Sequence, residues 1–339
     1  MTYGPPKIPK IRNIQLYAVF GYGRAQQKYD IEEVVLNTLI PTALRKGDTV
    51  MVSACAGVVD LKRLKTSLDL LKDHFNFLVP NSIDRSFGYL AGNDQERADE
   101  INEGLRNPDV RAIWVARGGF GLTRILHLLD PAPLQNDPKP IIGYSDVTAL
   151  HAWSHLNGLR SIHGPVLNFL DTCQQEDIDH LVAGLLGDPT HVFCNLKKGM
   201  KDSDALALPD KHTRLLGGNL TVISHLIGTP YELNLNESLL MLEDVGEKPY
   251  ALDRSMTHLK HSGALDGCEG LLLGDFTHCD SNDVTGVETV LKRAGDFGVA
   301  ARGGLPVGHG DRNKSFSYGG LVNVKEEVLT LVDSLTEKR

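Results

Sequence analysis

From residue 47 onward, short runs rich in β-branched and apolar residues alternate with stretches whose leucines recur at helical spacing. The run GDTVMVSAC at 47–55 predicts a buried strand, and 61–75 predicts a helix because its leucines stand three and four residues apart. Strands that alternate with helices favour a mostly parallel sheet covered on both faces. The same alternation predicts strands at 75–80, 110–116 and 140–144, and helices at 93–107 (capped by Asn93), 122–129 and 147–156.

The alternation weakens over 168–212 and then resumes, which indicates a second α/β domain. Further helices are expected at 178–187, 250–263 and 287–298, and the stretch 215–230 is expected to be a glycine turn that leads into a helix. Further strands are expected at 238–243, 268–274 and 326–334. The predicted organisation is an N-terminal extension at 1–35, an N-terminal α/β domain at 36–170, a crossover at 171–212 and a C-terminal domain at 213–339.

Composition excludes several classes of protein. The net charge of −8, with no dense lysine and arginine stripe, argues against a nucleic-acid partner. No apolar run reaches about 18 residues, so we expect no membrane span. Residues 1–13 lack the apolar core of a signal peptide, and the five cysteines show no C-x-x-C spacing, so we expect a reducing cytoplasm. The pair His258 and His261 has no third ligand of matching context, so we expect no metal and no cofactor.

The stretch PIIGYSDVTALH at 140–151 places Ser145 where a predicted strand meets a predicted helix. Active sites of parallel α/β sheets gather beyond the carboxyl ends of the strands. Gly143 leaves room for a tight turn that presents the serine, which is the logic of a nucleophile elbow. The N–H of Asp146 would then point toward a developing oxyanion. The alternative is that Ser145 or Asp146 simply caps the helix.

A catalytic serine needs a base. His309 stands between two glycines in LPVGHGDRN, where the backbone can turn sharply and leave the imidazole uncrowded. His163 in SIHGPV is presented in a similar way. A loop histidine can equally be an ordinary surface residue.

The orienting carboxylate is expected in SLLMLEDVGEKPY at 238–250. Glu243 ends a strongly apolar strand, and Asp244 and Glu247 follow it. A carboxylate at that position can accept an imidazole N–H and stabilise the imidazolium. The alternative is that these acids cap the next helix or pair with Lys248 and Arg254.

The loop RGGFG at 117–121 follows a predicted strand and precedes a predicted helix. Its glycines expose backbone N–H groups, which suits phosphate or an oxyanion. It matches neither G-x-G-x-x-G nor a Walker A sequence, so nucleotide binding is disfavoured.

Taken together, these stretches resemble the LD-carboxypeptidase family of serine peptidases, which comprises murein tetrapeptide carboxypeptidases and microcin C self-immunity peptidases. The resemblance runs from about residue 40 to 335 and rests on ARGGFG, IIGYSDVTALH, IHGP, GGNLTVISHLIGTP, LEDVGEKPYALDRSMTHL and LPVGHGDRN, in that order. It implies an N-terminal parallel-sheet (Rossmann-like) domain that carries the nucleophile, a C-terminal mixed α/β domain that supplies the other two residues, and an active site in the cleft between them.

The resemblance also implies a Ser–His–Glu triad in which Ser145 is the nucleophile, His309 the general base and Glu243 the orienting acid. The matching oxyanion donors are the backbone N–H of Asp146 and that of Gly118 or Gly119.

Three points stay open within this resemblance. Glu247 is close enough to Glu243 to be a rival triad acid. Phe120 stands where the family commonly has tyrosine, and SACAG at 53–57 replaces an APSG-like turn. Neither departure touches the triad, but both bear on substrate detail.

The expected activity is that of a cytoplasmic, homodimeric serine carboxypeptidase that removes terminal D-Ala from a murein tetrapeptide during peptidoglycan recycling. The close alternative is a microcin-type peptidase that cleaves peptidyl or aminoacyl nucleotides with the same triad. An α/β-hydrolase esterase is disfavoured because GYSDV lacks the second glycine of G-x-S-x-G. The non-enzyme alternative is an anion-binding protein that uses the RGGFG loop.

Overall fold

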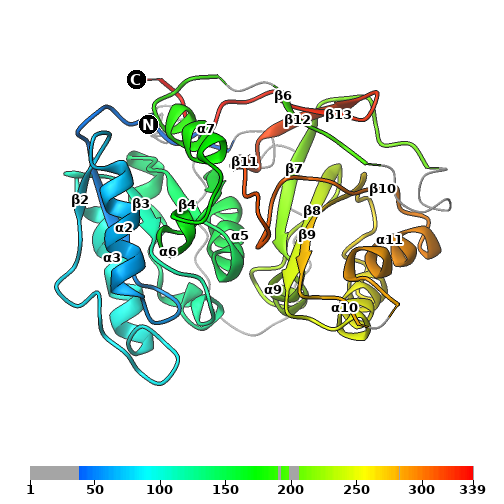
Figure 1. The fold of residues 1–339 in the computed structure, drawn as a ribbon, viewed down its shortest axis with the longest axis horizontal. Helices are drawn as coiled ribbons and strands as arrows, with labels where there is room; N and C mark the ends of the chain where they lie inside the picture. The colour runs from blue at the N-terminus through cyan, green and yellow to red at the C-terminus, as the bar shows by residue number, and fades with distance from the viewer. Residues whose placement is uncertain (1–37, 190–191, 198–205, 282, 339) are drawn as a thin grey trace, which may run out of the picture. The chain divides into compact units, whose positions relative to one another are not determined.

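The computed structural model describes residues 38–189, 192–197, 206–281 and 283–338. Residues 37–339 form one compact unit. The expected extension at 1–35 lies outside the described residues. The unit contains two β-sheets, and helix α5 (Thr148–Leu156) packs against strands of both (Figure 1).

The first sheet has six strands in the order β11-β5-β4-β3-β1-β2. Its strands are β1 (Thr49–Ser53), β2 (Asn76–Leu78), β3 (Val110–Val115), β4 (Ile141–Gly143), β5 (Ser161–His163) and β11 (Phe316–Tyr318). All are parallel to their neighbours except β11, which pairs antiparallel with β5. The carboxyl ends of β1, β3 and β4 therefore lie at one edge, where a site is expected.

The helices of this half cover both faces of the sheet because strand side chains alternate in direction. In β1, Val50 and Val52 belong to one apolar core and Met51 to the other. The first core includes side chains of α2 (Leu61–Leu71), α6 (Leu167–Leu170) and α7 (Gln175–Leu185), and the second those of α3 (Asp94–Arg106), α4 (Ala132–Asn136) and α5. Asn93 caps α3 in a capping box with Glu96, as predicted.

The second sheet has seven strands in the order β10-β9-β8-β7-β12-β13-β6 and is mixed. Strands β7 (Thr213–Asn219), β8 (Ser238–Val245), β9 (Gly270–Thr277) and β10 (Ala301–Arg302) are parallel. Strands β12 (Leu321–Lys325), β13 (Val328–Leu331) and β6 (Val192–Asn195) continue it with antiparallel pairings. The expected two-domain α/β fold, with a parallel-sheet first domain and a mixed second sheet, is confirmed.

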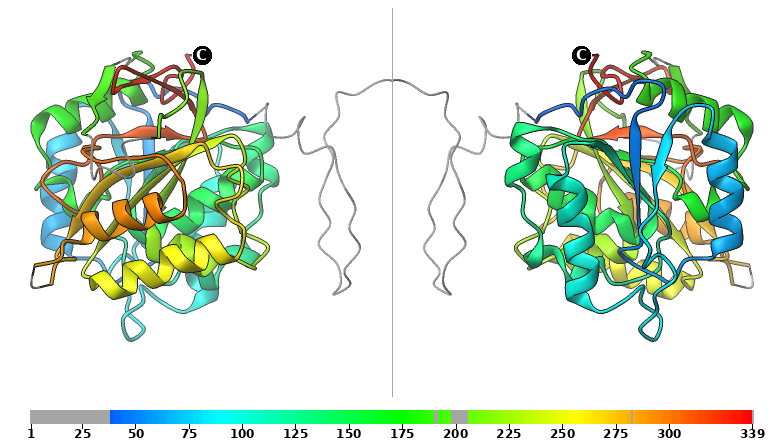
Figure 2. Two further views of the ribbon diagram at one scale, coloured as in Figure 1. Left: turned by 90° about the vertical axis from the view of Figure 1, so that its right-hand side faces the viewer. Right: turned by 90° about the vertical axis from the view of Figure 1, so that its left-hand side faces the viewer.

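Besides α5, the helices that follow β7, β8 and β9 lie against the second sheet or against one another. Helix α9 (Leu220–Leu226) contacts α5, whereas α10 (Pro249–His261) and α11 (Gly286–Asp296) cover the face turned away from the first sheet (Figures 1 and 2). The domain boundaries at 36–170, 171–212 and 213–339 stay predictions. The strand pairings do not follow them strictly, since β11 lies in the first sheet and β6 in the second.

Two predicted elements differ from the structure. Residues 122–129 form two 3₁₀ turns, η1 (Leu122–Arg124) and η2 (Leu126–Leu128), in place of one helix. The glycines expected to form a turn lie inside β7, where Gly217 and Gly218 have positive φ angles. A Cβ on Gly217 would collide with the backbone of Met241 in β8, and one on Gly218 with Thr148 of α5. These glycines permit close approach of backbone, which a single sequence does not distinguish from a turn.

Candidate active site

Ser145 lies at a sharp corner between β4 and α5. It begins the 3₁₀ turn η3 (Ser145–Val147) and has a φ of 65°, which is rare for a residue other than glycine. A Cβ on Gly143 would lie 2.8 Å from Cγ2 of Val147, so the turn needs glycine there. This strained strand–turn–helix geometry is that of a nucleophile elbow.

The Asp146 carboxylate does not cap α5, whose N-terminus has no side-chain cap. Instead its Oδ2 accepts a hydrogen bond from the backbone N–H of Leu122 at 2.9 Å. Burial raises the pKa of Asp146 to about 7, against the opposing effects of the Leu122 hydrogen bond and the Arg97 charge. The side chain thus ties the RGGFG loop to the serine corner.

Gly118 packs directly on Ser145. A Cβ built on Gly118 would lie 2.8 Å from the Ser145 Cβ and 2.9 Å from its Oγ. The carbonyl of Gly118 accepts a hydrogen bond from the N–H of Gly57 at 2.9 Å. Because a trans peptide directs its C=O and N–H to opposite sides, the N–H of Gly119 points away from Gly57. The loop therefore brings backbone to the serine hydroxyl, which any side chain at position 118 would prevent.

Glu243 comes from the second sheet, and His309 from the loop that joins β10 to β11. Glu243 lies near the end of β8 and is fully buried, and its Oε2 is 2.6 Å from Nδ1 of His309. Burial alone would lower the pKa of His309, but the charge of Glu243 and the hydrogen bond to it raise the pKa above its usual value. The Glu243 carboxylate therefore orients the imidazole and stabilises its protonated form.

The glycines beside His309 are required by the loop's contact with β9. The N–H of Asp275 donates to the carbonyl of Val307 at 2.9 Å. A Cβ on Gly308, which has a φ of 133°, would lie 3.2 Å from the Asp275 Cβ, and one on Gly310 would collide with the Asp275 carboxylate. The loop is thus held against the end of a buried strand, which fixes the His309 backbone.

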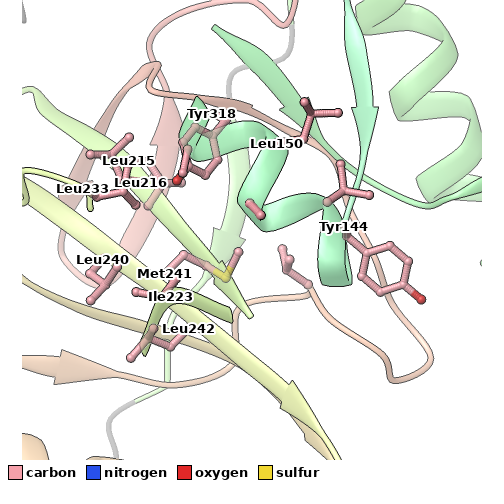
Figure 3. Close-up of a cluster of buried hydrophobic side chains, with 14 of the residues drawn as sticks. Tyr144, Leu150, Leu215, Leu216, Ile223, Leu233, Leu240, Met241, Leu242 and Tyr318 are labelled. Carbon is pink, nitrogen blue, oxygen red and sulfur yellow. The ribbon is translucent and has the colours of Figure 1, made fainter. Parts of the chain in front are cut away.

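Tyr144 links the two halves of this arrangement. Its ring centroid is 4.6 Å from that of His309, and it immediately precedes Ser145 in the chain. Figure 3 shows the apolar side chains between α5 and the β7–β8 pair, with the Tyr144 ring turned away from the leucines of those strands. His309, paired with Glu243, thus packs against the residue that immediately precedes Ser145.

The other candidates have different surroundings. Among the described residues the His309 imidazole bonds to Glu243 and not to the half-buried Glu247. Asp244 is buried and accepts hydrogen bonds from Asn219 and Thr221 at the start of α9, a capping role.

His163 is fully buried and stacks on Phe316 with centroids 4.9 Å apart, and burial lowers its pKa. Its ring lies 6.2 Å from that of Tyr144 and has no hydrogen-bond partner among the described residues. His258 lies apart on α10, where Nδ1 is 3.1 Å from the hydroxyl of Ser224. Across the described ranges, no three metal-ligating side chains gather into a possible ion site.

A pocket of about 450 Å³ is lined in part by Gly119, the neighbour of the Gly118 that packs on Ser145. Its lining residues come from the ends of β1 and β3 and from the chain before α3, namely Gly57, Val58, Tyr89, Arg117, Gly119 and Phe120. Sequence reasoning missed Tyr89 and treated 53–57 only as a departure from a family pattern. The positions of 57–58 and 117–120 after predicted strands could have indicated this pocket, because residues that follow neighbouring parallel strands meet at one edge of the sheet.

The chain matches two protein-family models. Residues 50–164 match the LD-carboxypeptidase N-terminal domain, and residues 212–324 match the LD-carboxypeptidase C-terminal domain. The murein tetrapeptide carboxypeptidase of Pseudomonas aeruginosa is 31% identical over 291 residues, which cover 80% of this chain and 91% of that protein. No described helix is both long and apolar enough for a bilayer.

Solved structures show the same fold. The muramoyltetrapeptide carboxypeptidase from Oxalobacter formigenes aligns with a TM-score of 0.71 and 26% identity, over 84% of this chain and 97% of that one. The microcin C7 self immunity protein in its wild-type apo state aligns with a TM-score of 0.76 and 20% identity, over 88% of this chain and 100% of that one.

Proposed function

The chain belongs to the LD-carboxypeptidase family, and from this membership we propose that it is a serine carboxypeptidase that releases terminal D-Ala from a murein tetrapeptide. The observation that carries the serine-type assignment is the 2.6 Å contact of His309 Nδ1 with the buried Glu243, next to the strained Ser145 corner. We further propose a cytoplasmic location and a homodimer, in keeping with a role in peptidoglycan recycling.

In the proposed reaction, His309 donates its Nδ1–H to Glu243, which leaves Nε2 free to accept the proton of Ser145. The Ser145 oxygen attacks the scissile carbonyl, and the resulting tetrahedral intermediate carries an oxyanion. When the C–N bond breaks, the proton on His309 passes to the nitrogen of the departing D-Ala. Water then attacks the acyl-enzyme, again with His309 as base, and Ser145 recovers its proton.

The proposed oxyanion donors are the N–H groups of Asp146 and Gly119, with Gly118 supplying the close backbone approach. Each such donor contributes on the order of 3 kcal/mol to lowering the barrier. The raised pKa of His309 fits a base that must hold a proton during the lifetime of the intermediate. Because Glu243 is inaccessible to water, its charge acts on the imidazole with little screening.

The second candidate is hydrolysis of aminoacyl or peptidyl nucleotides by the same triad. The likeness to the microcin C7 self immunity protein is a likeness of fold at 20% identity, so the murein peptide stands first. A non-catalytic anion-binding role is the remaining alternative.

The test is mass spectrometry of L-Ala–D-Glu–meso-diaminopimelate–D-Ala incubated with the protein and with Ser145→Ala. We expect loss of one alanine with wild type only. An intact tetrapeptide with both proteins would overturn the murein proposal, and aminoacyl sulfamoyl nucleosides would then be assayed with the same pair. Equal turnover by Ser145→Ala would overturn the serine mechanism.

A further inference from the structure

We propose that Arg117 is the specificity-determining residue that binds the substrate's terminal carboxylate, within the pocket beside Ser145. This inference rests on the proposed function, because only a carboxypeptidase must recognise a free C-terminus. The pocket is joined to the serine through the RGGFG loop: Gly119 lines it, and Gly118 packs on the Ser145 hydroxyl. We therefore place the last residue of the substrate in this pocket and the bond to be cut at Ser145.

The Arg117 guanidinium is held in place but keeps its charge available. Its Nη1 donates to the carbonyl of Val58 at 2.6 Å, and both residues line the pocket, so this bond holds the side chain at the pocket wall. Among the residues that the structure describes, no carboxylate pairs with it. By contrast, Arg111 and Arg124, the preceding and following arginines in the sequence, pair with Asp137 and Asp94 at 3.0 and 2.8 Å. Arg117 is the charged residue of the pocket lining.

The pocket walls strengthen the case for a carboxylate ligand. The rings of Tyr89 and Phe120 lie 6.1 Å apart and are 66% and 46% exposed. A peptide end that covers these rings removes water from around Arg117, and a desolvated guanidinium binds carboxylate more strongly. The protein as a whole carries a net charge of −8, so an acidic peptide needs a local positive group to be drawn to this edge.

The chemistry follows from the shape of the guanidinium. It offers parallel N–H donors that match a carboxylate, whereas an internal peptide carbonyl offers one acceptor and no charge. An arginine at this position therefore favours cleavage of the last residue over cleavage within a chain. It also keeps the leaving amino acid in place while its nitrogen receives the proton from His309.

The test compares the tetrapeptide with a free C-terminal acid against the same peptide with a C-terminal amide. Wild type, Arg117→Gln, Arg117→Lys and Arg106→Gln are assayed for kcat/KM on both substrates. Arg106 is the matched control. It is an exposed arginine that ends the helix before β3 and pairs with Asp130, whereas Arg117 follows the end of β3 and lines the pocket. Thermal unfolding of each variant checks that the loop is intact.

We expect Arg117→Gln to lower kcat/KM for the acid about 10- to 100-fold, mostly through KM, and to leave the amide nearly unchanged. Arg117→Lys should keep part of the preference and Arg106→Gln all of it. An equal loss on both substrates, or no loss on either, would overturn the assignment to the terminal carboxylate.

A second measurement keeps this inference separable from the proposed function. Calorimetric binding of both peptides to Ser145→Ala, with and without Arg117→Gln, reports recognition without turnover. If wild type cleaves neither peptide, the murein proposal fails. An acid preference that disappears with Arg117→Gln would then still support the inference, and equal binding of acid and amide would overturn it.

Discussion

The Nδ1 of His309 lies 2.6 Å from Oε2 of Glu243, and this contact holds the pKa of the imidazole above its usual value despite burial. A general base works only when it is neutral, so kcat/KM should fall as the pH drops through this raised pKa. The limb on the acid side of the profile should therefore lie above about pH 6.5.

Glu243→Gln removes the charge that raises the pKa of His309 and leaves burial, which lowers it. We expect the acid limb to move to lower pH and kcat to fall on the order of 10⁴-fold, the cost of losing the carboxylate of such a triad. Glu247→Gln is the matched control and should keep the wild-type profile. If Glu247→Gln shifts the limb and Glu243→Gln does not, the triad acid has been misassigned.

Gly118→Ala should impair catalysis more than stability. The added methyl would lie 2.9 Å from the Ser145 Oγ, so the hydroxyl and the oxyanion loop must move apart. We expect kcat to fall about 10²- to 10³-fold, the scale of one lost oxyanion donor, with a smaller change in KM. Gly303→Ala is the control, because the nearest atom to its added Cβ is 4.0 Å away and its φ is not positive. Comparable losses in the two variants would remove the special role of Gly118.

Burial raises the pKa of the Asp146 carboxyl, which follows the proposed nucleophile Ser145 in the chain, and Asp146→Asn tests this by replacing the carboxyl with a neutral amide. With a pKa of about 7 when folded and about 4 when unfolded, wild type binds more protons folded than unfolded between those values. Its free energy of unfolding should therefore fall as the pH rises from 4 to 7. Asparagine stays neutral and can still accept from the N–H of Leu122, so the variant should lack this decline.

The measurement is denaturant unfolding of wild type and Asp146→Asn at several pH values. We expect a gap on the order of a few kcal/mol to open between pH 4 and 7 and then stay constant. Asp94→Asn gives the opposite sign, because Arg124 and Arg97 lower the pKa of Asp94 and its contribution to stability is lost as the pH falls. Parallel curves for wild type and Asp146→Asn would contradict the prediction.

Tyr144 should matter through its ring and not its hydroxyl. The ring packs on His309 with centroids 4.6 Å apart, and Tyr144 is 4% exposed. Tyr144→Phe should keep kcat within about threefold. Tyr144→Ala should lower the free energy of unfolding by about 3–5 kcal/mol, as other large-to-small core changes do, and should lower kcat further by releasing the imidazole. Chemical denaturation and steady-state kinetics check both, and equal kinetics in the two variants would argue against the positioning role.

The sequence was informative where a local pattern had one physical meaning. Alternating runs predicted β1 to β4 of the first sheet but missed the short parallel strand β5, and the glycine before Ser145 correctly predicted a tight corner. The sequence-based prediction was wrong at β7. A glycine pair is typical of a turn, but Gly217 and Gly218 lie inside a strand, where they allow neighbouring backbone to approach closely.

The pairing of His309 with Glu243 could not be derived from spacing, since 66 residues separate them and several histidines and acids compete. In the sheet β9 lies between β8 and β10, and the loop that follows β10 is held against β9 through Val307 and Asp275, so that His309 reaches Glu243 in β8. The contact of Tyr144 with His309 and the position of Tyr89 in the pocket have the same origin. The local sequence therefore predicts which side chains are candidates for a site, and long-range packing determines which of these side chains contact one another.

The strand that follows the His309 loop completes the first sheet, since Phe316 pairs with His163 and Tyr318 with Ser161. The polypeptide thus enters the second domain and returns to finish the first. The chain therefore cannot be cut at one point into two complete domains, because a fragment that ends before β11 would leave the edge of β5 unpaired. Exchange of halves between relatives would therefore have to carry this returning strand along, whereas loops at the sheet edge can diverge without it.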